Sequence, residues 1–428
     1  MIRGAISKIL PLTIKKIIRR NISVYKNIPP NNMSDEIYND ILNTNNTSKK
    51  ISILHSYGIN IFHLDENCRN NIINCLSGNP EAIQETYKLF SNIDSNELSF
   101  YSWLSIYDLY RRIGLYSTGL VFRDKALKKM ISLNPKNLKK NQVRYFISGN
   151  LELNQIQGFN DFCKIINQLK ISEKEKNYWI IFGSFWYEGA HDIDLKQIEY
   201  SELYANEVKD KTIAIVCPSE SSNLDAGEID LHDRVIRLNY SVKGKSCDHK
   251  YKGLRSDITY FMKEHGNSFF INEGGLLPND LKWACFKDLS HSKRAESINS
   301  RIKVRTMSSE KWRDKSFHAS YNGIQNILLD LLIYKPKLCK IYHSDMFLTL
   351  LRAKGYTPKT MGNNDLNYRI LNINKAYHDP VANHIFMKRL YQLGKIEVDT
   401  ILRDVLEMET ANYCKKLEDT YSQHTKTL

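Results

Sequence analysis

The stretch YHDPVANHIFMKRLYQLGKI at residues 377–396 places a histidine directly before a predicted amphipathic helix. Asp379 can cap the first free N–H groups of that helix, Pro380 suits its first turn, and Gly394 suits its exit. A nearby helix N-terminus disfavours a charged imidazolium, so we expect His378 to be neutral and able to accept a proton. The residue types therefore suit a general base. A surface histidine in a capping loop is the structural alternative.

Helical spacing and strand-like runs predict the elements that position this histidine. After residue 378, apolar side chains recur at helical spacing and are expected to face a core: Val381, Ile385, Phe386, Leu390 and Leu393. Short β-branched and aromatic runs predict buried parallel strands near 211–217 and at 233–239, 256–262, 282–286, 301–306 and 338–344, with a long helix at about 322–334. This pattern predicts an open α/β sheet with a ligand site at the carboxyl ends of its strands.

The first strand is followed by CPSESSNLDAGEIDLHD, which contains neither a dinucleotide-binding glycine motif nor a phosphate-binding loop of the nucleotide triphosphatase type. The sequence therefore does not support those two kinds of site. An Asp-Ile-Asp stretch at 192–194 is expected in a helix or linker before the first strand, so we do not expect it to bind a metal.

The region before the predicted sheet has a helical pattern. Residues 99–137 resemble one helix-turn-helix unit of the tetratricopeptide kind, whereas a full solenoid needs about three such units. We therefore expect four parts: a basic amphipathic segment at 1–30, a helical domain at 31–205, an α/β domain at 206–410 and a C-terminal tail at 411–428.

Composition favours a globular protein with anionic partners. The chain has 428 residues and a formal net charge of +14, which favours nucleotide-linked substrates, nucleic acid or an anionic membrane face. The basic residues are dispersed and no recognised nucleic-acid motif accompanies them, so we do not expect nucleic-acid binding. Irregularly spaced cysteines, with Cys217 and Cys339 expected at buried strand ends, favour reduced thiols in a cytoplasmic protein.

The first 26 residues mix seven Lys or Arg residues with Ile and Leu. Such a segment can lie on anionic lipid, and a solvated helical face is the alternative. No run reaches the roughly 18 apolar residues of a membrane span. The sequence therefore predicts a cytoplasmic protein, with peripheral association at the inner membrane face as a further hypothesis.

Three ordered segments resemble sialyltransferases. GEIDLHDRVIRLNY at 227–240 resembles the long donor-binding motif of the eukaryotic enzymes, and SYNGIQNILLDLLIYKPKLCKIYHSDMF at 320–347 resembles their second nucleotide-binding segment. YHDPVANHIFMKRLYQLGKI resembles the bacterial transferases that use CMP-sialic acid, in which a catalytic histidine precedes a late helix. The resemblance covers about residues 211–396 and extends to related transferases of CMP-linked nonulosonic acids and Kdo. It implies a Rossmann-like, mostly parallel sheet domain of the GT-A-like sialyltransferase variant, preceded by an all-helical domain.

The resemblance also implies roles for individual residues. It implies that His378 is the base and that the CMP-sugar donor is held by Ser219, Asn239, Ser320, Asn322, Gly323, Ser344, Asp345 and Tyr377. The chain departs from the family in two turns: Cys217-Pro218-Ser219 replaces an Asn-Gly-Pro-Ser-like turn, and Asn322-Gly323 replaces Ser-Gly. CMP is an activated leaving group, so the implied reaction requires no metal and no cofactor beyond the donor.

The expected function is inverting transfer of sialic acid or a related 2-keto sugar acid from its CMP donor to a glycan acceptor of a capsule or lipopolysaccharide. The acceptor is expected to be an oligosaccharide or a lipid-linked glycan. A non-enzymatic helical scaffold or interaction protein with a degenerate α/β domain is the alternative.

Overall fold

The fold is given by a computed structural model of the chain. It describes residues 80–189, 200–219, 223–240, 249–308, 315–349 and 378–425, together with residues 52 and 70 and apart from 93, 97, 113 and 224. The predicted basic segment 1–30, the Asp-Ile-Asp stretch at 192–194 and Tyr377 lie outside the described residues.

The chain divides into two compact units. One contains residues 1–149, 374–377 and 414–428, and the other contains residues 150–373 and 378–413. This division differs from the expected boundary near residue 205, because the helices α10 (Phe159–Gln168), α11 (Glu173–Ser184) and α12 (Glu202–Val208) group with the strands. The predicted helical domain at 31–205 is therefore not confirmed as a unit, although every element described between residues 80 and 208 is helical.

The first unit contains a helical hairpin where the sequence predicts one. Its elements are α6 (Pro80–Asn92), α7 (Phe100–Arg112), α8 (Tyr116–Ile131), η1 (Pro135–Asn137), most of α9 (Lys140–Glu152) and most of α21 (Thr410–Thr425). Gly114 turns the chain between α7 and α8 with a φ of 87°, which glycine adopts without strain. The ring of Phe122 packs against Trp103 and Tyr110, with ring centroids 6.0 and 4.8 Å away.

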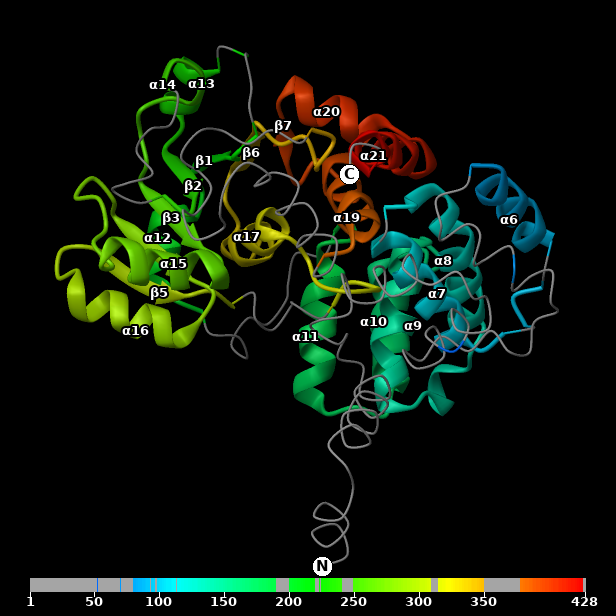
Figure 1. The fold of residues 1–428 in the computed structure, drawn as a ribbon. Helices are drawn as coiled ribbons and strands as arrows, with labels where there is room; N and C mark the ends of the chain where they lie inside the picture. Colours follow the sequence, from blue (N-terminus) through cyan, green and yellow to red (C-terminus); the bar gives the residue numbers. More distant parts are fainter. Residues whose placement is uncertain are drawn as a thin grey trace, which may run out of the picture. The chain divides into compact units, whose positions relative to one another are not determined.

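The second unit is built on a seven-stranded, wholly parallel sheet in the order β5-β4-β3-β2-β1-β6-β7 (Figure 1). The strands are β1 (Thr212–Val216), β2 (Arg234–Leu238), β3 (Ile258–Phe261), β4 (Trp283–Phe286), β5 (Lys303–Thr306), β6 (Leu338–Tyr342) and β7 (Glu397–Val398). All six predicted strands are confirmed, and β7 is an addition of two residues. The α/β class is confirmed.

Helices connect the strands. They are α13 (Ala226–Leu231), α14 (His249–Lys252), α15 (Lys263–Glu273), α16 (Leu289–Ile298), α17 (Gly323–Leu331), η4 (Leu332–Tyr334), α19 (Pro380–Gln392) and α20 (Thr400–Glu407). The long helix expected at 322–334 is therefore α17 followed by a 3₁₀ turn.

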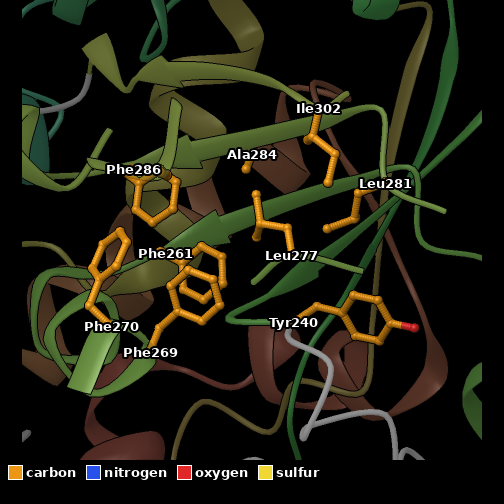
Figure 2. Close-up of a cluster of buried hydrophobic side chains, with 10 residues drawn as sticks. Tyr240, Phe261, Phe269, Phe270, Leu277, Leu281, Ala284, Phe286 and Ile302 are labelled. Carbon is orange, nitrogen blue, oxygen red and sulfur yellow. The ribbon is translucent and has the colours of Figure 1, made fainter. Parts of the chain in front are cut away.

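Adjacent residues of β3 show that both faces of the sheet are covered. The hydroxyl of Tyr260 donates to Asp330 of α17 at 2.8 Å, whereas the next side chain, Phe261, stacks on Phe269 of α15 with ring centroids 4.7 Å apart. Figure 2 shows Phe261 within a buried cluster that includes Phe270 and Phe286. This alternation follows from the two-residue period of a strand.

The predicted start and end of α19 are confirmed. The Asp379 side chain accepts the N–H of Val381 at 3.0 Å, Pro380 is in the first turn, and Gly394 follows the helix with a φ of 63°. Of the five side chains expected in the core, Val381, Phe386 and Leu390 are buried, while Ile385 and Leu393 are half-buried.

Cys217 and Cys339 are both buried, as expected. Among the residues that the structure describes, no helix combines the length and the apolar character that crossing a bilayer requires.

Candidate functional site

The order of the strands has a switch point between β1 and β6. The chain runs from the central β1 outward to β5 and returns on the other side of β1 as β6, so the direction of winding reverses between β1 and β6. Ligands of open α/β sheets bind at such a point. The N–H of Ser219 donates to the carbonyl of His343 at 3.2 Å, which joins the two loops that leave these strands.

Three predicted donor-binding residues, Ser219, Ser344 and Asp345, lie in these loops and are buried. The Ser219 hydroxyl donates to the Asp345 carboxylate at 2.9 Å. That carboxylate also accepts the N–H of Phe347 at 3.1 Å, and it accepts both the N–H and the hydroxyl of Thr349. Asp345 thus holds the turn after β6, and Ser219 is tied to it.

Two buried cations lie beside these loops. Lys252 is 3% exposed, and its ammonium donates to the carbonyls of Cys217 and Ser219 at 2.9 and 2.7 Å. Arg237 is 4% exposed and donates to the carbonyls of Lys252, Gly253 and Arg255. Positive charge in a site of low dielectric constant favours an anionic ligand. The sequence analysis assigned no role to either side chain, although Arg237 lies within the segment 227–240, because only the fold brings them to the end of β1.

Asn239, after β2, adopts a left-handed backbone conformation with a φ of 52°. Its side-chain carbonyl accepts the N–H of Met262 at 3.1 Å, so it also fixes the end of β3. A Cβ atom at Gly323 would lie 3.3 Å from Leu238 and 3.5 Å from Met262. The start of α17 therefore packs closely against the ends of β2 and β3, and glycine suits this approach.

Asn322 caps the N-terminus of α17. Its side chain accepts the N–H of Gly323 at 2.7 Å, and its own N–H donates to the side chain of Asn383 of α19 at 2.9 Å. The N-termini of α17 and α19 are therefore linked by a direct hydrogen bond. Unlike Ser344 and Asp345, Asn322 is half-buried.

His378 is held by Ser320 immediately before these two helices. The two residues form an isolated parallel bridge, and the Nδ1 atom of His378 lies 3.1 Å from the carbonyl oxygen of Ser320 and 3.5 Å from its hydroxyl. A carbonyl only accepts hydrogen bonds, so this contact assigns the proton to Nδ1 and leaves Nε2 as the proton acceptor of the ring. Both residues are half-buried. The arrangement suits a base.

Other polar residues of the segment 227–240 support the strands. Asp230 accepts the N–H groups of Leu254 and Arg255 at 2.8 and 3.0 Å. Asp233 accepts the N–H of Thr212 at 2.8 Å and so fixes the start of β1. Part of the segment 227–240 therefore serves to hold neighbouring loops in place.

A further group lies at the β6–β7 end of the sheet. Ligand atoms of Asp225, His343 and Asp399 all lie within 4.8 Å of one another, and they could hold a metal ion. The sequence analysis did not single out any of the three, since they come from separate loops.

The predicted residues thus form two groups at the carboxyl edge of the sheet, one with Ser219, Ser344 and Asp345 and one with the remaining described residues: Asn239, Ser320, Asn322, Gly323 and His378. No protein-family model and no curated protein matches this chain. The function is therefore inferred from the geometry of these residues.

Proposed function

We propose that the chain is an inverting glycosyltransferase that moves a sialic acid, or a related 2-keto sugar acid such as Kdo, from its CMP-activated donor to a glycan acceptor. The observation that carries the proposal is the contact between the Nδ1 atom of His378 and the carbonyl of Ser320. It presents a proton-accepting ring nitrogen next to a capped helix N-terminus at the carboxyl edge of an α/β sheet.

In the proposed reaction the acceptor hydroxyl attacks the anomeric carbon while Nε2 of His378 takes its proton. The new bond between carbon and the acceptor oxygen forms as the bond to the CMP phosphate breaks, and CMP leaves with the bonding electrons. A single displacement of this kind inverts the configuration at the anomeric carbon. The positive end of α17, at Asn322 and Gly323, would attract the phosphate or the sugar carboxylate through the helix dipole, since the N–H groups of these two residues already donate to side chains.

Buried positive charge supports an anionic donor. Lys252 and Arg237 lie beside the loops after β1 and β2, and a CMP-linked sugar acid carries both a phosphate and a carboxylate. We propose Asn239 and Ser219 as nucleotide contacts at the ends of β2 and β1. Asp345, with Ser344, would act by holding the loop on the cytidine side.

The leaving group of this reaction is already activated, so the transfer step itself has no need of a metal. We therefore expect initial rates of transfer to be unchanged in EDTA, measured at a temperature well below unfolding. Strict dependence of the rate on added Mg²⁺ or Mn²⁺ would contradict this part of the proposal.

The first experiment is a donor survey with the full-length chain. We expect release of CMP from CMP-sialic acid or CMP-Kdo that accelerates when glycan acceptors are added, with UDP-glucose as the control donor. The competing candidate is a helical scaffold with an inert α/β domain, and a hydrogen-bonded, half-buried His378 at the strand ends argues against it. Failure of every CMP-linked donor to react or to bind would favour the scaffold.

The acceptor is proposed to be a growing capsule or lipopolysaccharide glycan. This part rests on the sequence alone, through the basic segment at 1–26 that could hold the enzyme at the cytoplasmic face of an anionic membrane.

A further inference from the structure

Three side chains from three separate loops converge beside β6 and β7. Asp225 precedes α13, His343 directly follows β6, and Asp399 directly follows β7. One ligand atom from each lies within 4.8 Å of the other two. Atoms at this separation lie at most about 2.8 Å from a common centre, so each would need to move by no more than about 0.4–0.8 Å to reach the ligand distances of about 2.0–2.4 Å that such ions take.

The imidazole of His343 is arranged as a metal ligand would be. Its side chain is fully buried, and Nε2 lies 3.2 Å from the carbonyl oxygen of Tyr251. This contact assigns the ring proton to Nε2. Nδ1 is then a buried lone pair, and it has no hydrogen-bond partner among the described residues. A metal-bound histidine usually donates its other ring N–H to a carbonyl in this way.

The two carboxylates provide matching oxygen ligands. The Oδ2 atom of Asp225 is buried and has no hydrogen-bond partner within the described part of the chain. Asp399 accepts the N–H of His343 at 2.6 Å and the N–H of Leu402 at 2.9 Å, which orients its carboxylate and leaves further lone pairs on each oxygen.

The charge balance around the cluster favours a cation. Two carboxylates meet in this site, Asp399 buried and Asp225 half-buried, and their negative charges favour a cation. Lys340 lies near both, but it is ion-paired with Glu228. Two further cations, Lys252 and Arg237, act on His343. Both cations repel a metal ion, so the attraction of the two carboxylates must exceed this repulsion.

We propose that Asp225, His343 and Asp399 bind one divalent cation of the Mn²⁺ or Zn²⁺ class. One imidazole and two carboxylates suit this class of ion better than Ca²⁺, which prefers oxygen ligands alone. The cation joins the segments that follow β1, β6 and β7, and it thereby stabilises the folded chain against heat. This structural role goes beyond the proposed transfer reaction and takes no part in its chemical step.

The test is direct titration of the chelator-treated, full-length chain with Mn²⁺, in which the electron paramagnetic resonance signal of free Mn²⁺ reports binding. Mn²⁺ is the preferred probe because cysteine thiolates compete for Zn²⁺. Two variants remove ligands, Asp225→Asn and His343→Gln. Asp161→Asn is the matched control, since Asp161 is an exposed carboxylate paired with Lys164 on α10.

We expect the wild type and Asp161→Asn to bind one Mn²⁺ with equal affinity and to unfold at a higher temperature when Mn²⁺ is present. Each ligand variant should bind at least about tenfold more weakly. Absence of binding by the wild type at millimolar Mn²⁺, or equal binding by Asp225→Asn, would overturn the proposal. Asp225→Asn keeps the size of a half-buried side chain, so it decides the test even if His343→Gln fails to fold. No donor or acceptor is present, so the result is independent of the proposed transferase activity.

Discussion

The two groups of predicted site residues differ in how their polar atoms are used. On the β1–β6 side, the Asp345 carboxylate is buried and accepts hydrogen bonds from Ser219, Phe347 and Thr349. On the α17–α19 side, Asn322 and His378 are half-buried and lie at the starts of two helices. The first side holds loops in place, whereas the second joins the starts of two helices and is the side where we propose that the base acts. Residues of one sequence motif can therefore have different physical roles.

The largest effect, on turnover, is expected from removing the proposed base on the α17–α19 side. His378→Ala should lower transfer by about 10²–10⁴-fold, because the acceptor hydroxyl loses its base. The measurement is the turnover number with saturating donor and acceptor. His291→Ala, which changes a histidine of α16, is the matched control and should retain full turnover. Turnover of His378→Ala at the wild-type level would remove this histidine from the mechanism.

The next largest effect, on stability, is expected from removing hydrogen bonds on the β1–β6 side. Asp345→Asn replaces an acceptor of several hydrogen bonds with an amide that carries one acceptor oxygen, so we expect the free energy of unfolding to fall by about 1–3 kcal/mol. Urea denaturation measures this loss, and Asp161→Asn is again the control. The Michaelis constant for the donor should change little in the folded fraction. Wild-type stability together with a much raised donor Michaelis constant would instead assign Asp345 to direct donor binding.

The sequence predicted the fold better than it predicted the state of individual side chains. The six longer strands are recognisable because buried parallel strands are almost continuously apolar, as in Thr212–Val216. The two-residue β7 has too few residues for a pattern. The cap at Asp379 was predictable because capping depends on local sequence. The burial of Asp345, the cations near β1 and the cluster around His343 depend on contacts between distant segments, which local patterns do not encode.

A smaller effect, on the pH dependence of stability, is expected from His384, which lies in the helix that His378 precedes. His384, inside α19, is fully buried, its Nε2 lies 3.0 Å from the carbonyl of Val405, and burial lowers its pKa to about 4. The unfolded state, with a pKa of about 6.5, binds a proton that the folded state does not bind between these two values. The contribution of His384 to stability is therefore complete above pH 6.5 and is lost as the pH falls toward 4, by at most about 1.4 kcal/mol per pH unit.

Chemical denaturation at a series of pH values checks this prediction. His384→Gln should be less stable at pH 7 because it changes a buried side chain, and its stability should fall less steeply between pH 6.5 and 4. His265 and His343 also have pKa values lowered to about 4 by burial, so part of the slope should remain. A slope equal to that of the wild type would mean that His384 does not contribute to the acid sensitivity. His378→Gln, which changes a histidine on the α17–α19 side, is the control.

The smallest expected effect on catalysis comes from a region outside both groups. Deleting residues 1–26 should release the chain from anionic vesicles, since each basic residue near the surface contributes on the order of 1 kcal/mol at low salt. Co-sedimentation should show a difference that shrinks as salt increases. Activity on a small soluble acceptor should survive, because both groups of site residues follow residue 211. Equal vesicle binding by the two forms would show that the basic segment does not hold the chain on lipid.

The most direct test of the central claim is the anomeric configuration of the first product formed from a CMP-linked sugar acid, measured by nuclear magnetic resonance as the reaction proceeds. Single displacement by an acceptor hydroxyl, with His378 as the base, predicts a product whose anomeric configuration is opposite to that of the donor. A product that retains the donor configuration would contradict this mechanism, since retention requires a second displacement or a different geometry of attack.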